Sequence, residues 1–473
     1  MSGSWVSLLP FLIVIPISIF TKQVQPGLFV ALILGSYLKT PDLLGGMKSM
    51  ISYIVKNMIQ MNNIRIIIFL YLFAGIISMI KLAGGIKGFV FLVSKKIKSK
   101  TGAMALTWIS TMFTFCDPDF RIVTIAPIMK ALREKLNMSK QKIGIVIEIT
   151  SNPVVGLIPI ATAFVGYMVS VIHMAMKSSG IQGQPYIYYI KSIPFNFFSF
   201  VIIILGLYYT FFMHKDEASM KDDNKDLNED QGEEGLEQCY RAYEKETPTK
   251  PWNFILPIFI VLSTTLFLSW WDGHSKAKNF FDAFLKSDVL GVMLEGLFIG
   301  LIFSLIFFMF QRINISKLVT HFVKGGNELM SVVIMLSLIW AVSNVAEDLG
   351  FSKYVTSHVT GLIPHFFIAP SLFVLGGILS YFIGSSWGTW GLLMPLGVAL
   401  AKEGNANIFL CIGAVFASGT LGAFASPLSD NTVTLCTILD LPVIDYAKSK
   451  LLPTLIAGGI TTGLYVCAAF VFR

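Results

Sequence analysis

Long apolar runs recur throughout this chain, and they restrict the folds that it can adopt more than any other feature. Hydrophobic residues make up 54% of the 473 residues and charged residues only 14%. Several runs approach the length of about 18 residues at which a helix can cross a bilayer. A chain that crosses hydrocarbon must satisfy its backbone hydrogen bonds internally, which helices achieve. The sequence therefore predicts an all-α polytopic membrane protein, multi-pass in the plasma membrane and surrounded by the lipid bilayer.

Charge and cysteine usage argue against several other classes. The net charge is +8, but the basic residues flank the apolar runs, as the positive-inside rule describes, so no nucleic-acid partner is expected. The five cysteines are scattered without a CxxC pair, so neither a disulfide framework nor a metal centre is predicted. Without a nucleophile, base or metal triad, we expect neither enzymatic activity nor a cofactor. The histidines expected in loops or at helix ends are His173, His214, His274, His321, His358 and His365.

The first half begins with predicted helices at about residues 8–20, 27–38 and 64–80. No basic stretch precedes the first of them and no small-residue cleavage site follows it. We therefore expect a retained helix rather than a signal peptide.

Two basic clusters follow, at residues 95–100 and 130–142, and both are expected on the cytoplasmic side. The segment between them then enters and leaves on one side, and each of its arms has about fifteen residues, too few to span a bilayer. The sequence predicts a re-entrant hairpin with Asp117, Pro118 and Asp119 at its tip. Two short helices joined by an external turn are the alternative.

A broken spanning helix is expected at residues 143–173. It carries Glu148 and then TSNPVVGLIP, whose prolines and glycine weaken the backbone ladder. After a helix at about 193–213, residues 214–250 contain twelve acidic and six basic residues. Such a segment cannot bury enough apolar surface to fold alone, so we expect a flexible cytoplasmic linker between two halves.

The second half repeats the order of the first. The membrane orientation of each successive predicted helix follows from its flanking charges and its length. This count gives two inverted repeats, residues 1–213 and 251–473, with both termini outside and the linker inside. Each repeat is expected to hold about five transmembrane helices, including a broken one, and one re-entrant hairpin, the usual construction of secondary transporters. The second-half elements are predicted at 252–271, 289–310, 329–345, a hairpin at 368–400, a broken helix from 408 and a last helix from 451.

Two polar segments interrupt the apolar chain of the second half. They read GSSWGTWGLLMPLGVALA from Gly384 and FASPLSDNTVTL from Phe424. Irregular backbone and ionisable side chains are tolerated at membrane depth only where they face protein or a watery cavity. A helix broken at Ser426 and Pro427, with Asp430 just beyond the break, is therefore predicted to form an ion or substrate site. A cytosolic loop between two helices is the alternative.

Four segments together resemble the paired motifs of NhaC-type sodium/proton antiporters, within the ion transporter superfamily. They are FCDPDFRIVTIAPIM and EITSNPVVGLIPI in the first half, and GSSWGTWGLLMP and ASPLSDNT in the second. The similarity covers nearly the whole chain, least so the acidic linker. The resemblance implies two inverted repeats and transport by alternating access. Members of this family include sodium/proton antiporters, sodium-linked malate/lactate exchangers and amino acid carriers.

The chain departs from the family pattern at two places. Members typically read Phe-Asp-Asp-Tyr-Phe-Asn where this chain reads Cys-Asp-Pro-Asp-Phe-Arg, ending at Arg121, so Asp117 is kept and the second acid is Asp119. They commonly read Gly-Asp-His-Cys-Ser-Pro where this chain reads Gly-Ala-Phe-Ala-Ser-Pro, which removes an acid and a histidine. Asp430 and Glu148 stand where the family has acids. These departures leave the predicted fold and the carrier class unchanged, but they weaken the argument for a plain sodium/proton exchange cycle.

Oxygen-bearing side chains near the breaks are the candidate ion ligands, because hard cations prefer oxygen. We expect Asp430, Ser426 and Asn152 to bind Na⁺, together with carbonyls freed at the breaks. For a single hydroxyl or amide, hydrogen bonding between helices is the alternative. A carboxylate at mid-helix costs about 2.5–3.5 kcal/mol unless it is used or paired. The full candidate set is Asp117, Asp119, Arg121, Glu148, Thr150, Ser151, Asn152, Ser385, Ser386, Trp387, Thr389, Ser426, Ser429, Asp430, Asn431 and Thr432.

The sequence predicts an ion-coupled secondary transporter, most simply a Na⁺/H⁺ antiporter in which both ions compete for one carboxylate. A Na⁺- or H⁺-coupled carrier of a malate- or lactate-like organic acid, or of an amino acid, is the alternative. Arg121 bears on this choice, because it either neutralises Asp117 or Asp119 or binds a substrate carboxylate through its bidentate fork. A channel would need a continuous polar pore, which these isolated clusters do not suggest. A homodimer is left open.

Overall fold

The computed structural model describes residues 5–472 apart from 22, 86–96, 98, 115–117, 160–161, 213–249, 276, 278, 280–282, 284–286, 352 and 355–363. The elements of this part of the chain are all helices. The all-α fold class is therefore confirmed. The predicted linker, apart from Lys250, lies outside the described residues.

Both halves run through the same order of elements. Each begins with two helices packed on each other and continues with a short and a longer helix, a helix pair, and helices interrupted by a break. The opposite membrane orientation of the halves stays a prediction. The first half contains η1 (Trp5–Leu8), α1 (Leu9–Thr21), α2 (Val24–Lys39), α3 (Leu43–Met58), α4 (Met61–Leu82), α6 (Lys100–Thr114), α7 (Pro118–Leu136), α8 (Lys140–Ile149), α9 (Asn152–Val155), α10 (Ala163–Ser178), α11 (Pro185–Ser192), η2 (Ile193–Phe195) and α12 (Phe197–Phe211). The second half contains α15 (Trp252–His274), α17 (Val289–Phe310), α18 (Ile315–Glu328), α19 (Met330–Asp348), α21 (His365–Ile383), α22 (Ser386–Glu403), α23 (Ile408–Ala425), α24 (Asp430–Leu439) and α25 (Val443–Val471).

The apolar helices are long enough to cross a membrane. Within the described residues, seven helical stretches meet the length and composition of a span, or eight if the bent pair Pro185–Phe195 and Phe197–Phe211 forms one. Large apolar side chains on them remain exposed on the protein surface, among them Phe259, Ile302 and Leu455. Extended apolar surface of this kind is stable against lipid rather than water. The chain is a multi-pass membrane protein.

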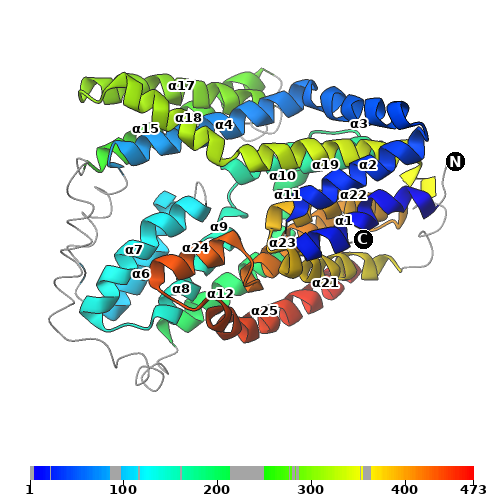
Figure 1. Cartoon of the computed structure of the whole chain (residues 1–473). Helices are drawn as coiled ribbons and strands as arrows, with labels where there is room; N and C mark the ends of the chain where they lie inside the picture. Colours follow the sequence, from blue (N-terminus) through cyan, green and yellow to red (C-terminus); the bar gives the residue numbers. More distant parts are fainter. Residues whose placement is uncertain are drawn as a thin grey trace.

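The helices form two groups, which Figure 1 shows one above the other. In the upper group α4, α15, α17 and α18 pack on one another, and in the lower group α21 packs on α22, α23 and α25. The central α10 contacts both α4 and α22 and so connects the groups. The interrupted helices α8/α9 and α23/α24 belong to the lower group, where α24 also packs on α7.

The helices α3 and α18 were not predicted from the sequence. Each follows an apolar helix and mixes polar and apolar residues, so neither forms a continuous apolar run. On α3, Leu43, Met47 and Ile51 are exposed while Asn57 is buried. An amphipathic helix of this kind shows only in its 3.6-residue periodicity, which a search for apolar runs does not detect.

The last helix and two histidines differ from the sequence prediction. α25 begins at Val443, eight residues before the predicted start at 451. His173 lies within α10 and His321 within α18, so the prediction that all six histidines occupy loops or helix ends is wrong for these two.

The contact between α21 and α23 depends on glycine. A Cβ atom on Gly422 would lie 2.3 Å from the carbonyl oxygen of Gly377 and 2.5 Å from the backbone nitrogen of Tyr381. These are backbone atoms that cannot rotate away. We expect Gly422→Ala to lower the free energy of unfolding in detergent by about 3 kcal/mol. The control is Gly459→Ala on α25, where a Cβ meets no atom within 4 Å. Equal stability of the two variants would contradict this account of the contact.

Candidate functional site

The predicted break in the second half is present between α23 and α24. Pro427 restricts the preceding residue to extended backbone, and Ser426 accordingly ends α23 with φ −72° and ψ 134°. The hydroxyl of Ser426 donates to the carbonyl of Tyr381 (2.7 Å) and accepts from the N–H of Leu428 (3.0 Å). Ser429, which is buried, precedes α24 without capping it through its side chain. The break is thus held against α21 by the hydrogen bond of the Ser426 side chain.

The tip of the second helix pair lies against this break. Gly384 ends α21 in the left-handed region (φ +76°), and a Cβ there would lie 2.7 Å from the carbonyl carbon of Leu428. The hydroxyl of Ser386 donates to the Gly419 carbonyl of α23 (3.1 Å). Ser385 caps α22 by accepting from the N–H of Gly388 (3.3 Å). Where the sequence predicts a hairpin, the structure has the two consecutive helices α21 and α22. That this pair enters and leaves the membrane on one side stays a prediction.

Aromatic side chains join the same tip to α10. The ring of Trp387 packs edge-on against Phe164 (4.6 Å between centroids) and Tyr167 (4.7 Å). The hydroxyl of Tyr167 donates to the Trp387 carbonyl. Thr389, fully buried, donates to the carbonyl of Ser385 (3.0 Å). In this conformation Trp387 packs against α10, and the Thr389 hydroxyl is bonded within its own helix.

The predicted break in the first half follows α8. Residues Thr150 and Ser151 separate α8 from the short α9, and Ser151 has φ −95° and ψ −104°. Both hydroxyls donate back to carbonyls of α8: Ser151 to Ile147 (2.7 Å) and Thr150 to Val146 (2.7 Å). Residues 143–173 are thus helical with interruptions, as predicted, whereas their path as a single broken span stays a prediction.

The two breaks meet at Glu148. One carboxylate oxygen accepts from the hydroxyl of Thr432 on α24 (2.7 Å). The other accepts from the hydroxyl of Tyr446 (2.7 Å) and the ammonium of Lys450 (2.7 Å), both on α25. Glu148 and Lys450 are 4% and 0% exposed. The structure therefore joins two predicted residues, Glu148 and Thr432, that are 284 positions apart, in a buried ionic cluster.

Sequence reasoning missed Lys450 and Tyr446. The last helix was expected to begin at 451, which left both residues outside the predicted helix. One signal was available: Tyr446 and Lys450 are four residues apart, which places them on the same face of a helix.

Arg121 attaches the first helix pair to the first break. This residue is fully buried on α7. Its Nη1 donates to the hydroxyls of Ser110 (3.2 Å) and Thr114 (2.7 Å), and its Nη2 donates to the Thr107 carbonyl (2.6 Å). Both Nη2 (2.6 Å) and Nε (3.2 Å) donate to the hydroxyl of Thr150. All of these acceptors are neutral oxygens, and no carboxylate among the described side chains pairs with Arg121.

The remaining predicted ligands have few contacts. The side chains of Asp430 and Asn431, in the first turn of α24, and of Asn152, at the start of α9, form no hydrogen bond with a described residue. No hydrogen bond joins Asp430, Ser426 and Asn152 to one another. Asp117 and the side chain of Asp119 lie outside the described residues, so their pairing with Arg121 stays a prediction.

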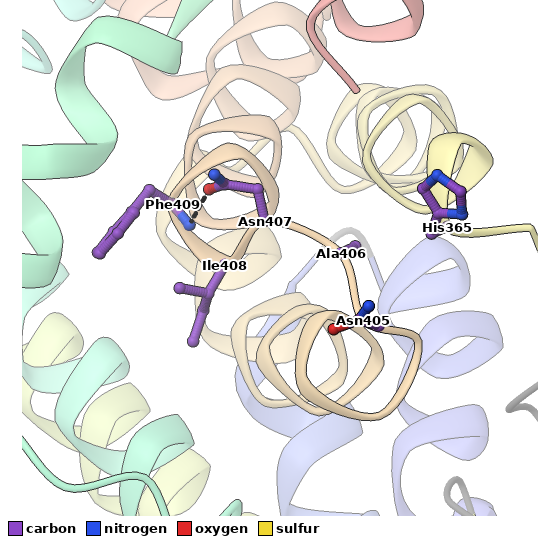
Figure 2. A pocket seen from close by; sticks show the side chains of 6 residues that line it. All are labelled: His365, Asn405, Ala406, Asn407, Ile408 and Phe409. Atoms are coloured by element: carbon purple, nitrogen blue, oxygen red, sulfur yellow. Dashed lines mark hydrogen bonds between the residues drawn. The ribbon is translucent and has the colours of Figure 1, made fainter. Parts of the chain in front are cut away.

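A cavity of about 480 Å³ opens elsewhere, at the loop between α22 and α23. Figure 2 shows it beside His365 and residues 405–409, with Asn407 capping α23 through the N–H of Phe409 (3.0 Å). The 18 residues of α23 separate this loop from the break by about 27 Å at 1.5 Å per residue. The cavity is therefore not part of the helix-break site.

A helical membrane fold with ionic groups buried where two helices are interrupted is the construction of a secondary transporter. Residues 154–469 match the family model described as "Na+/H+ antiporter family". This match covers more than half of the chain, and the chain belongs to that family.

Sequence relatives agree with this assignment. The chain is 25% identical over 490 aligned positions to an uncharacterized protein of Haemophilus influenzae, covering 100% of this chain and 92% of that protein. It is 30% identical over 111 positions to the malate-2H⁺/Na⁺-lactate antiporter of Bacillus subtilis, covering 22% of this chain and 24% of that protein. It is 35% identical over 107 positions to the arginine/ornithine antiporter ArcD of Halobacterium salinarum, covering 21% of each.

Solved transporter structures share the fold. MtrF of Neisseria gonorrhoeae matches with a TM-score of 0.63 at 12% identity, over 90% of this chain and 85% of its own. The YdaH transporter of Alcanivorax borkumensis matches with a TM-score of 0.61 at 11% identity, over 91% and 90%. At these identities the likeness concerns the fold alone. The family match identifies the chain as an ion-coupled secondary transporter.

Proposed function

We propose that this transporter exchanges Na⁺ for H⁺ by alternating access. The observation that carries the proposal is the direct contact between the two helix breaks, where Glu148 of α8 accepts from Thr432 of α24 at 2.7 Å. A carboxylate at a helix interruption can hold either a dehydrated sodium ion or a proton. Asp430 lies two residues before Thr432 and has no described partner, so it is available to an ion.

The experiment is a sodium jump applied to proteoliposomes that contain the purified chain and a pH-sensitive dye. We expect an outward sodium gradient to acidify the lumen without any organic solute, since sodium exit must then draw protons in. Protein-free liposomes and a choline gradient are the controls. If proteoliposomes that contain the folded, purified chain show no more proton movement than protein-free liposomes, the exchange function is overturned.

We also propose that the two halves are inverted repeats in the plasma membrane, with both termini outside and residues 214–250 in the cytoplasm. The common order of elements in the two halves supports this arrangement. Single cysteines near Lys98 and Ser139, in a background without native cysteines, should react only from the cytoplasmic side. Labelling of the two positions from opposite sides would contradict it.

A second candidate is a Na⁺- or H⁺-coupled carrier of an organic acid or amino acid. Two relatives carry such solutes by name, lactate and malate in one and arginine and ornithine in the other, although each covers about a fifth of this chain. The observation in favour is the buried guanidinium of Arg121, whose described partners are all uncharged. Neither proposed function requires a homodimer.

A further inference from the structure

Lys450 occupies an unusual position for a lysine. Its side chain is 0% exposed on a helix of spanning length, α25. The ammonium lies 2.7 Å from a carboxylate oxygen of Glu148 and 2.7 Å from the hydroxyl oxygen of Thr432. It also lies over the rings of Tyr446, at 4.9 Å from the centroid, and Phe424, at 5.2 Å. Oxygen ligands and aromatic faces thus surround a single positive charge.

The same surroundings suit an inorganic cation. Hard monovalent cations take oxygen ligands, and the cluster supplies the carboxylate of Glu148 and the hydroxyls of Thr432 and Tyr446, each bonded to that carboxylate at 2.7 Å. Phe424 is the penultimate residue of α23. The C-terminal end of a helix carries partial negative charge, which favours a cation there.

We propose that Glu148, Thr432 and Tyr446 form a binding site for a monovalent cation, and that the Lys450 ammonium is its tethered occupant, which a sodium ion displaces. This inference rests on the proposed function, because it assumes that sodium enters the site during transport. A buried carboxylate left without any cation is strongly unfavourable. The site therefore holds either the ammonium or the ion, and the two compete.

The competition is tested by the sodium dependence of thermal unfolding in detergent. A ligand that binds only the folded state stabilises it by RT ln(1 + [L]/Kd), so the unfolding temperature starts to rise when the ligand concentration passes the dissociation constant. Lys450→Met should unfold at a lower temperature than wild type in N-methylglucamine chloride, because Glu148 is left unpaired. Sodium chloride at equal ionic strength should restore much of that loss. The rise in unfolding temperature should begin at a sodium concentration at least about tenfold lower than in wild type, since the competing ammonium is gone.

The matched control is Glu148→Gln/Lys450→Met, which removes both charges and should show no sodium effect beyond that of other sites. Tyr446→Phe keeps the ion pair and removes one oxygen ligand, so the sodium concentration needed to raise its unfolding temperature should be higher than in wild type. This variant tests the proposal if Lys450→Met does not fold. Equal sodium dependence in Lys450→Met, the double variant and wild type would overturn the cation site. That result would not contradict the exchange function, which is tested separately by proton movement in wild-type proteoliposomes.

Discussion

Replacing Asp430 by asparagine should reduce sodium-driven proton movement in proteoliposomes to the level of empty liposomes. The change removes the only carboxylate in the first turn of α24 while keeping the shape of the side chain. An amide cannot neutralise a dehydrated sodium ion, nor can it carry the proton in exchange. Dye-reported fluxes over a range of sodium concentrations provide the measurement.

Folding should survive this substitution. The Asp430 side chain forms no hydrogen bond or ion pair with a described residue, and its favourable interaction with the start of α24 is worth about 0.3–1 kcal/mol. The control is Asp445→Asn, in the first turn of α25, where the acid faces Lys448 in an exposed pair at 3.9 Å. That variant should transport like wild type. Full transport by Asp430→Asn would remove this residue from the ion site.

Local chemistry made the helix breaks predictable from the sequence. Pro427 restricts the residue before it, and this effect depends on two neighbouring residues only. The break after α8 likewise follows from Pro153 and Gly156, which lie within ten residues of Glu148. For the same reason the candidate ligands at each break could be named, although their contacts could not.

The pairing across the two halves could not be predicted in this way. Glu148 and Thr432 are joined by helix packing, and nothing in either local pattern specifies which residues face each other 284 positions apart. Lys450 was missed for a different reason. Lysines close to an apolar run are usually flanking charges, and only the packing of α25 on α8 and α24 shows that this one is buried.

Arg121→Met should destabilise the protein by at least about 3 kcal/mol, since a hydrogen bond from a charged group contributes about 1.5–3 kcal/mol. The guanidinium donates to Thr107 and Thr114 of α6 and to Thr150 beside the first break, so the variant loses the link between these elements. Arg65→Met is the control. Arg65 pairs with Asp288 at 2.7 Å, but this pair is partly exposed and should contribute at most about 1 kcal/mol.

Transport by Arg121→Lys then distinguishes the two candidate functions. Lysine restores the charge with three donors instead of five and without the planar fork. If Arg121 only holds the first helix pair against the break, Arg121→Lys should retain sodium/proton exchange at a reduced rate, and organic acids should not change it. If Arg121 binds a substrate carboxylate, wild type should take up a labelled organic acid with sodium, Arg121→Lys should fail to do so, and sodium alone should move no protons. We expect the first pattern, because the donors of Arg121 already have protein acceptors, and a substrate would have to displace them at a cost in hydrogen bonds.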